Sequence, residues 1–402
     1  MPRLTRDSIT WLTYAQLGLW GFFLYGFGPV VPLLRDEQGT SAAVAGLHST
    51  AIAVGALLGG AAFAPLARRV GRGTASWVGL VGVAVGVTAF GTLRPLPATL
   101  ASVVVIATAG MLVISGVSVV LTARHGEAAP AALTEANAAC AGMGILAPLV
   151  IGASVAAGLG WRPVLAVEVA LIASVALAAR LFRVRLPQLP VTPGPAVAGA
   201  VASGRLPRAY WIAWVLMAVT GSIEVCLSLW TADVLRSHAG MSSGGASGAV
   251  AAIVCGMFLG RLAGGRFALQ WPPASLLLAA LAVSLGGFTV FWLAPVGWLA
   301  VTGLVVLGLG NALHYPLAIS IALAVAGPAA ADKAAGWASY SMGVGFGIAP
   351  VALGAVADGV GPHLAFLLLP GFIAAAALLT VRLGRALRTP TSAPAPASAR
   401  CA

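Results

Sequence analysis

The residues best suited to chemistry in this chain form a polar stripe inside an apolar run that begins near Tyr210. The stripe consists of Thr220, Glu224, Ser228 and Thr231. At about 100° per residue of an α-helix, these side chains fall within about 80° of arc and face one direction. A carboxylate at the centre of a membrane-length helix costs on the order of 2.5–3.5 kcal/mol on insertion scales. Glu224 therefore predicts a compensating water-filled path, a partner or a bound proton.

Three further apolar runs carry polar stripes. Their members are Thr13, Gln16, Trp20 and Phe23 in the first run, Thr108, Met111, Ser115, Ser118 and Thr122 in the fourth, and Asn311, His314 and Tyr315 in the tenth. The striped runs are therefore the first, fourth, seventh and tenth. Each of them is the first run in a group of three consecutive runs. We predict that the four stripes line a substrate path, with His314 as a second proton-binding group. The alternative is structural, because such hydroxyls often bond their own helix or join helices.

Other embedded ionisable groups are weaker candidates. Glu135 and His48 are considered for substrate or proton binding, although an acid at a helix start is also expected for Glu135. Glu168 lies about two turns into the sixth run, where we expect it to pair with Arg162. Solvated positions at the outer rim are expected for Asp233 and Asp358.

Several classes of site have no counterpart in the sequence. There is no Gly-x-x-x-x-Gly-Lys-Ser/Thr run for a nucleotide phosphate, no Ser/His/Asp constellation, no paired-cysteine motif and no His-rich metal pattern. We therefore expect no enzyme activity, no cofactor and no metal. None of the four striped runs has an arginine or lysine at mid-depth, which favours neutral, zwitterionic or cationic solutes over anions.

The composition predicts a chain whose solvent is mostly lipid. Of 402 residues, 60% are hydrophobic and 8% are charged, and the mean hydropathy is +0.99. A soluble domain carries about 25% charged residues. We predict an all-α membrane protein with twelve spans. Their approximate ranges are 10–34, 42–67, 74–93, 99–122, 130–158, 162–182, 209–236, 243–268, 272–293, 297–326, 331–358 and 361–383.

The net charge of +12 is explained by topology rather than by nucleic acid, which we do not expect as a partner. If both termini are cytoplasmic, all but four of the 22 basic residues lie on the inner side. The outer four are Arg35, Arg94, Arg162 and Arg236. The single lysine and the abundant alanine and glycine suggest a GC-rich bacterial genome. The expected location is thus the bacterial plasma membrane.

An internal repeat supports two six-helix bundles. Ala147-Pro148-Leu-Val-Ile-Gly152 matches Ala349-Pro350-Val-Ala-Leu-Gly354 at an offset of 202 residues. We predict an N-terminal bundle at 1–186 and a Pro/Gly/Ala-rich linker at 187–208. A C-terminal bundle at 209–386 and a disordered tail at 387–402 complete the expected organisation.

The loop after the second run carries a family resemblance. Its sequence is Ala64-Pro-Leu-Ala-Arg68-Arg69-Val-Gly71-Arg72-Gly73. It resembles the Gly-x-Leu-Ala-Asp-Arg-x-Gly-Arg-Arg signature of the major facilitator superfamily, with Arg68 in place of the family's acid. Gly260-Arg261-Leu-Ala-Gly-Gly-Arg266 resembles the second-half copy of this signature. The Gly/Pro pattern around Pro148 is similar to that of proton-coupled antiporters.

This resemblance implies a twelve-helix fold in two pseudo-symmetric bundles. Arg68, Arg69, Gly71, Arg72, Arg261, Arg266, Pro148 and Pro350 are then candidates for gating. The expected activity is proton-coupled export of a small neutral or cationic, moderately apolar solute by a monomer in the lipid bilayer. Uptake of a neutral nutrient is the alternative. A lipid flippase or scramblase, or a polytopic protein without transport activity, is the alternative from another class.

Overall fold

The computed structural model describes residues 4–187, 206–268, 270–327 and 331–388, and these form an all-helical protein. Twelve of its helical segments are long and apolar enough to cross a membrane, as predicted. The predicted linker and tail lie almost entirely outside the described residues. The helices are α1 (Ser8–Gln38), α2 (Ala42–Val70), α3 (Arg72–Thr92), α4 (Leu96–His125), the 3-10 turn η1 (Gly126–Ala128), α5 (Ala129–Ala156), α6 (Arg162–Leu181), α7 (Arg208–Ser237), α8 (Ser243–Ala249), α9 (Ala251–Ala268), α10 (Pro273–Leu293), α11 (Gly297–Asn311), α12 (His314–Ala326), α13 (Ala331–Val360), α14 (Pro362–Ala365) and α15 (Leu368–Arg388).

Local sequence signals account for where the first helices begin and end. The Asp7 carboxylate accepts a hydrogen bond from the Thr10 amide at the start of α1, and Ser41 similarly caps α2. Between α2 and α3 the chain turns at Gly71, whose φ of 84° favours glycine. These caps let membrane-length helices follow one another with very short connections.

Three of the predicted spans are discontinuous. The eighth divides into α8 and α9, the tenth into α11 and α12, and the twelfth into α14 and α15. Proline explains two of the interruptions, because it lacks an amide donor and its ring clashes with the carbonyl four residues earlier. Pro316 follows the break after Asn311, and Pro370 follows the break after Ala365. The break in the tenth span falls within the predicted Asn311–His314 stripe.

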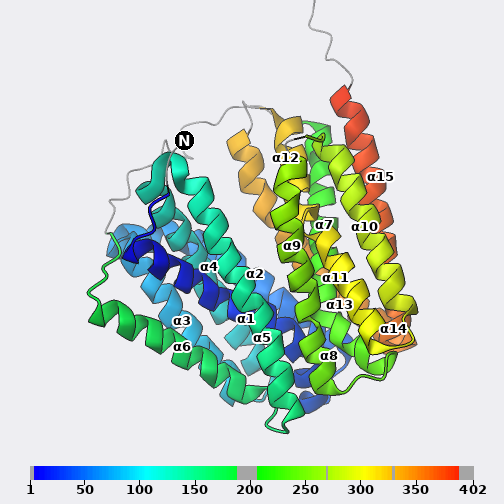
Figure 1. Cartoon of the computed structure of the whole chain (residues 1–402), viewed down its shortest axis with the longest axis horizontal. Helices are drawn as coiled ribbons and strands as arrows, with labels where there is room; N and C mark the ends of the chain where they lie inside the picture. Colours follow the sequence, from blue (N-terminus) through cyan, green and yellow to red (C-terminus); the bar gives the residue numbers. More distant parts are fainter. Residues whose placement is uncertain (1–3, 188–205, 269, 328–330, 389–402) are drawn as a thin grey trace, which may run out of the picture.

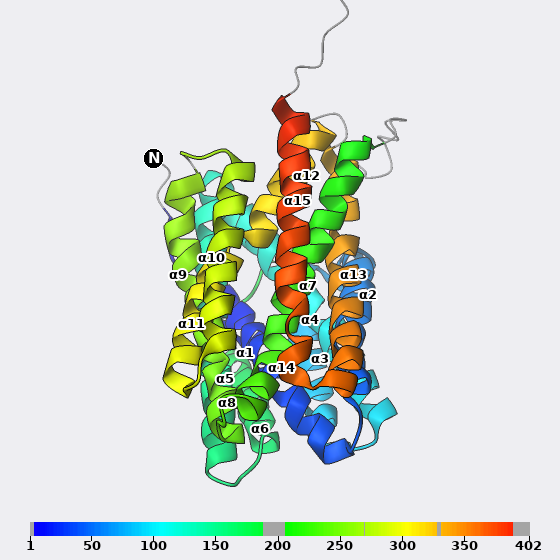
Figure 2. The same cartoon turned by 90° about the vertical axis from the view of Figure 1, so that its right-hand side faces the viewer.

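Helices α1–α6 form one bundle and helices α7–α15 form the other (Figures 1 and 2). At one end of the molecule, which we call the closed end, small residues bring the bundles into contact. A Cβ added to Gly152 of α5 would lie 2.6 Å from the Gly244 carbonyl oxygen of α8. A Cβ on Gly354 of α13 would lie 2.5 Å from the Ala42 carbonyl oxygen of α2. The glycines of the sequence repeat thus lie at close contacts between the bundles.

Charged side chains reinforce the closed end. Arg35 at the end of α1 forms a salt bridge with Asp233 of α7, and Arg236 of α7 bonds Asp36 at 2.7 Å. The Asp358 carboxylate of α13 accepts hydrogen bonds from two amides at the start of α2, at 2.7 and 3.0 Å. An anion at a helix N-terminus is favourable there. Hydrogen bonds and ion pairs therefore join the two bundles at this end.

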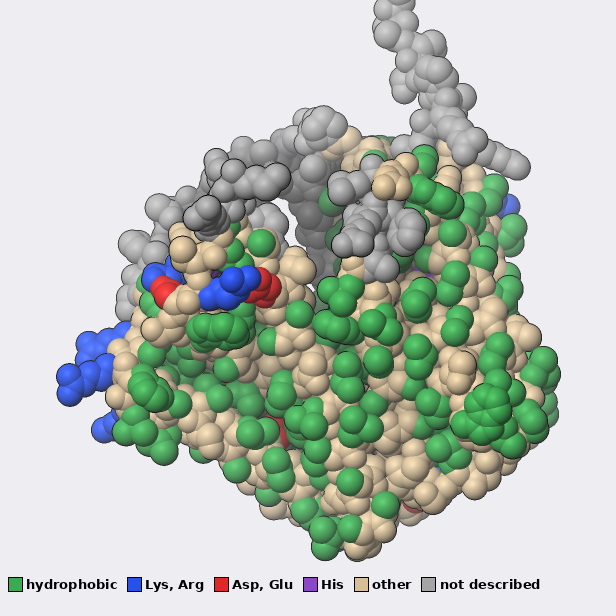
Figure 3. All heavy atoms as spheres, viewed as in Figure 1, with side chains coloured by type: hydrophobic (Ala, Val, Ile, Leu, Met, Phe, Trp, Pro, Cys, Tyr) green, Lys and Arg blue, Asp and Glu red, His purple; other side chains and the backbone are tan. Residues whose placement is uncertain are grey.

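The opposite end, which we call the open end, has a different pattern. There Arg6 bonds Glu135 at 2.8 Å and Arg124 bonds Asp7, so both ion pairs stay within the N-terminal bundle. Figure 3 shows the surface hollowed between the bundles near the upper end of the view. Among the described residues, the ion pairs that join the two bundles, Arg35–Asp233 and Arg236–Asp36, lie at the closed end. The hollow and the position of these ion pairs indicate that the two bundles are parted at the open end.

Candidate substrate and proton site

A central cavity lies between the two bundles and is lined by α1, α2, α7, α9 and α13. It leaves about 80 Å³ for the centres of water-sized molecules, and one water needs about 10–15 Å³ on that measure. Its polar lining groups are Tyr25, Glu224 and Ser228, and the remaining lining side chains are apolar. The cavity can therefore hold several waters or a small apolar group beside one carboxyl.

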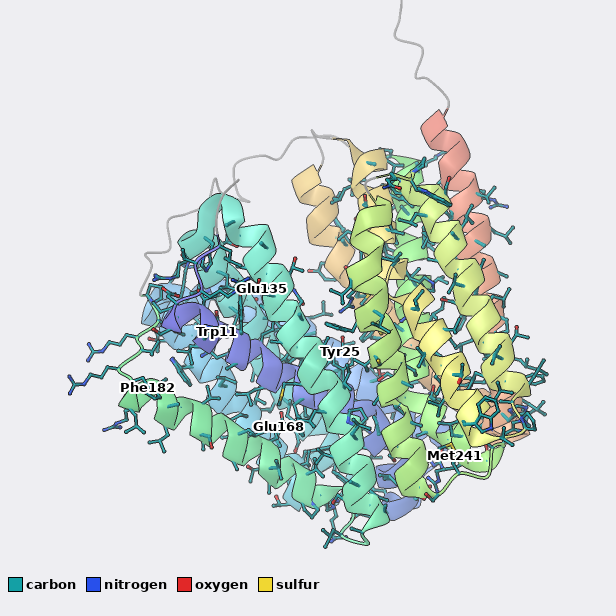
Figure 4. The ribbon with its side chains drawn as sticks, in the orientation of Figure 1. Trp11, Tyr25, Glu135, Glu168, Phe182 and Met241 are labelled. Atoms are coloured by element: carbon teal, nitrogen blue, oxygen red, sulfur yellow. The ribbon has the colours of Figure 1, made fainter. Side chains whose placement is uncertain are left out.

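Glu224 has identifiable electrostatic neighbours. It interacts electrostatically with the Arg261 guanidinium of α9, which also hydrogen-bonds the Tyr25 hydroxyl. Tyr315 of α12 interacts electrostatically with Glu224 as well. Figure 4 shows Tyr25 at the boundary between the bundles. Groups from both bundles thus meet at one carboxyl.

Arg261 changes the electrostatic reasoning from sequence. No cation was expected in the path, because the four striped spans lack one at mid-depth. Arg261 comes from the eighth span, outside those four, and its side chain is exposed. The cavity region therefore combines a carboxyl with a guanidinium. The sequence argument against an anionic group on the solute considered only the four striped spans, so it did not include this cation.

A close helix crossing positions the Glu224 stripe against α1. A Cβ added to Gly28 would lie 2.1 Å from the Ser228 carbonyl oxygen, so only glycine fits there. Ser228 lines the cavity one turn after Glu224. Thr220, one turn earlier, is buried and donates its hydroxyl to the Met217 carbonyl at 2.9 Å. One hydroxyl of the stripe therefore lies at the cavity, whereas the other hydrogen-bonds the backbone of its own helix.

The tenth-span residues lie at different distances from the cavity. The Asn311 amide contacts the sulfur of Met257 at 3.7 Å, and Met257 lines the cavity. His314 is buried against α10, where its Nε2 lies 3.0 Å from the Ser284 hydroxyl. The structure therefore places Asn311 directly behind the wall, Tyr315 near Glu224 and His314 inside the C-terminal bundle.

The stripe on the first span faces away from the cavity. Gln16 is buried and accepts a hydrogen bond from Ser76 of α3 at 3.0 Å, and Trp20 packs beside Gly110 of α4. Tyr25 is nine residues beyond Gln16, which is about 180° around a helix. It therefore lies on the opposite face, which is why the polar stripe did not reveal it.

The remaining binding candidates lie elsewhere in the N-terminal bundle. Thr108 donates its hydroxyl to the Val104 carbonyl at 2.7 Å, and Ser115 is half-buried on the same helix. Glu135 accepts hydrogen bonds from Arg6 and from the Tyr14 hydroxyl near the open end. His48 is buried, with its two ring nitrogens 3.1 and 3.0 Å from Ala45 O and Thr99 Oγ1. The structure does not bring these four residues to the cavity lining.

The gating candidates fall into two groups. Arg68 and Arg69 are exposed at the end of α2, Arg72 is half-buried at the start of α3, and Gly71 forms the turn between them. Arg266 belongs to α9, but its side chain lies outside the described part of the structure. Pro148 and Pro350 lie on the seams between bundles. A Cβ on Gly46 would be 2.9 Å from the Pro350 carbonyl oxygen, and one on Gly248 would be 3.8 Å from that of Pro148.

Two expectations about acidic residues are wrong. Glu168 does not pair with Arg162, because Arg162 bonds Glu37 at 3.2 Å and the Gly91 carbonyl at 2.5 Å. Asp233 is not a solvated rim residue, because it is 3% exposed and pairs with Arg35. Asp358 is exposed at the rim, as expected, and its carboxylate in addition caps α2. Tertiary partners from distant spans decide each case.

Comparison with known proteins identifies the family. A sequence model of the Major Facilitator Superfamily matches residues 15–341. The chain resembles a bacterial homologue of the human lysosomal transporter Spinster in an inward-facing, unoccupied conformation, with a TM-score of 0.78 and 16% identity over 95% of this chain and 97% of the other. It also resembles the nucleoside transporter NupG, with a TM-score of 0.71 and 14% identity over 94% and 98% of the chains.

A third similar structure is the peptide transporter POT in complex with sulfate, with a TM-score of 0.69 and 16% identity over 94% of each chain. At these identities the likeness shows the fold alone. The search of curated proteins gives no match. Because the family model covers most of the sequence, the chain belongs to the Major Facilitator Superfamily and is a multi-pass secondary transporter rather than an enzyme.

Proposed function

We propose that this protein moves a small, moderately apolar solute, neutral or cationic, across the bacterial plasma membrane in exchange for protons. The observation that carries the proposal is Glu224, a carboxyl in an otherwise largely apolar cavity between the bundles. An apolar lining suits a moderately apolar solute, and a carboxylate attracts a cation or binds a proton. Arg261 is the residue that would balance Glu224 when the carboxyl is ionised.

Alternating access supplies the mechanism. The cavity is reached from the open end. Rocking of the bundles would close that end and open the other. A Glu224 carboxyl that meets water on one side and then on the other can take up and release a proton. A cationic solute would compete with that proton, which links their movements in opposite directions.

Export is the proposed direction, with both termini in the cytoplasm. The arginines expected outside support this topology: Arg35, Arg94, Arg162 and Arg236 all bond carboxylates at the closed end. Under this orientation the open end faces the cytoplasm, where a solute for export would enter. The Pro148 pattern at the α5 seam also favours exchange with protons.

Lipid flipping is less well supported by the seams between bundles. A flippase of this fold would have a lateral opening between α2 and α13 or between α5 and α8. In the described residues, Ser49 and Thr50 of α2 donate hydrogen bonds to the carbonyls of Phe346 and Gly347 at 2.7 and 2.6 Å. The second seam is closed by the Gly152–Gly244 contact.

Untargeted mass spectrometry tests the proposal in cells that express the wild type or Glu224→Gln at matched membrane levels. We expect a solute that is depleted inside and enriched outside only with the wild type. Glu135→Gln is the matched control, because it removes a carboxyl that the structure places away from the cavity. The opposite distribution would indicate uptake. Retained pH-driven transport in a folded Glu224→Gln variant would overturn the role of Glu224.

A further inference from the structure

Glu168 of α6 is a buried carboxyl to which the proposed transport cycle assigns no role. Its residue is 0% exposed, and neither carboxyl oxygen has a hydrogen-bond partner. Figure 4 shows it in the N-terminal bundle, apart from Tyr25, and it is not among the residues that line the central cavity. A buried polar group is almost always hydrogen-bonded, so an orphaned carboxyl of this kind needs an explanation.

The surroundings of Glu168 form an apolar cage. Its walls come from α1, α3, α5 and α6 and include Phe22, Phe23, Phe27, Phe90, Ile151 and Leu165. The cage has only about 10 Å³ for the centres of water-sized molecules, which is at the lower limit for one water. An ionised carboxylate without a partner is very costly in such a place, so the neutral acid is the form that fits.

No neighbouring charge among the described residues compensates Glu168. Besides Glu168 itself, no titratable side chain lines the cage from any of its four helices. Arg162, at the start of the same helix, is bound to Glu37. His48 of α2 lies beyond the Phe90 ring, with ring centroids 6.4 Å apart, and its nitrogens are bonded elsewhere. A proton is therefore the simplest ligand that neutralises this carboxyl.

The walls of the cage also carry the contacts between bundles. Helix α1 crosses α7 at Gly28, and helix α5 meets α8 at Gly152. Opening of the closed end must separate these contacts, and it would shift α1 and α5 against α6. Such a shift would admit water or a polar partner to Glu168 and allow it to ionise.

We propose that Glu168 is a second proton-binding site, distinct from the central cavity, whose protonation stabilises the conformation with the closed end shut. A proton bound to one conformation in preference to another shifts the equilibrium between them. Rising pH should therefore favour opening of the closed end. The inference rests on alternating access, but not on Glu224 as the coupling group.

Spin-label distances across the closed end test this proposal with protons as the only ligand. Labels are placed at Leu159 and Trp298, which are 67% and 72% exposed, after the four native cysteines are replaced by alanine. We expect longer distances in the wild type as the pH rises from about 5 to about 9. Glu168→Gln, a neutral side chain of the same shape, should lose this shift and stay short at every pH.

Two further variants separate the possible outcomes. Glu224→Gln should retain the shift, which would distinguish this site from the proposed coupling group. Glu168→Leu is a second permanently neutral variant, in case Glu168→Gln does not fold, and it should also stay short. The loss of the infrared band of a protonated carboxyl in either neutral variant would support the proposal independently. An unchanged pH shift in a folded neutral variant, or no shift in the wild type, would overturn it.

Discussion

The Glu224 carboxyl and the Arg261 guanidinium interact electrostatically beside the central cavity. Glu224 stood out because an embedded carboxylate is costly. Arg261 was a candidate for gating but not for the cavity, because it belongs to a segment that resembles a cytoplasmic loop signature. Its role depends on how α9 packs against α5 and α11, which brings the guanidinium to Tyr25 and Glu224 and which no local pattern encodes. Residue types can therefore mark one half of an electrostatic pair and miss the other.

Asp7 provides a prediction for pH and stability outside the membrane-spanning helices. Partial burial alone would raise the pKa of Asp7, but hydrogen bonds from Arg124 and Thr10 outweigh it and lower the pKa to about 2. A carboxyl with a lowered folded-state pKa stabilises the fold above its unfolded pKa, near 3.8, and this contribution disappears as pH falls toward about 2.

Asp7→Asn tests this expectation, because asparagine still caps the helix but carries no charge. The wild type should have the higher unfolding temperature at neutral pH. The difference should shrink as pH falls below about 4. A difference that stayed constant down to about pH 2 would contradict the role of the Asp7 charge.

At the scale of helices, the polar stripes of the first and seventh spans face different surroundings. The seventh-span stripe delivers Glu224 and Ser228 to the cavity. The first-span stripe instead bonds within its bundle, as Gln16 does with Ser76. Periodicity shows which residues share a face, but it does not show what that face contacts. The choice between cavity and neighbouring helix is made by packing.

The ion pair between α1 and α7 should control the closed end. In Asp233→Asn, the Arg35 guanidinium loses its partner across the bundles, and such a charged hydrogen bond contributes about 1.5–3 kcal/mol. We expect the equilibrium to shift toward opening of the closed end. The measurement introduces Ala232→Cys as a reporter at this end. The rate at which a thiol reagent modifies this cysteine should rise about tenfold or more in Asp233→Asn, since 1.4 kcal/mol is a factor of ten in an equilibrium.

Arg94→Gln is the matched control for this measurement. It removes an ion pair with Glu37 at the same end, but within one bundle. The control should leave the modification rate near that of the wild type. Equal rates in the wild type and in Asp233→Asn would show that the ion pair does not hold the bundles together.

The glycine contacts between helices give another prediction. In Gly152→Val, the new side chain would collide with α8, because even a Cβ would lie 2.6 Å from the Gly244 carbonyl oxygen. We expect this variant to disfavour the shut conformation, with lengthened spin-label distances across the closed end. Gly142→Val on the same helix is the control, since a Cβ there has no neighbour within 4 Å. Similar distances in both variants would contradict tight packing at this seam.

At the scale of the whole molecule, the sequence was sufficient for the span number, the approximate span boundaries and the repeat. Long apolar runs and the distribution of basic residues do not depend on how the helices pack. These features can therefore be predicted from local sequence. The conformation was not readable, because both access states use the same helices. The pairings of Arg162 with Glu37 and of Arg35 with Asp233 likewise depend on how spans pack in three dimensions.

The glycine seams have a consequence for how the halves recognise one another. Gly152 meets Gly244, while Gly354 meets Ala42, and both members of the second pair are displaced by the same 202 residues. The same contact is thus made twice, each time between equivalent positions of the two repeats, as in the isologous interface of a two-fold dimer. The closed end is, in effect, a dimer interface between two half-length subunits within a single chain. Such an interface is self-complementary by geometry, so the two bundles should find this register even when they are supplied as separate polypeptides.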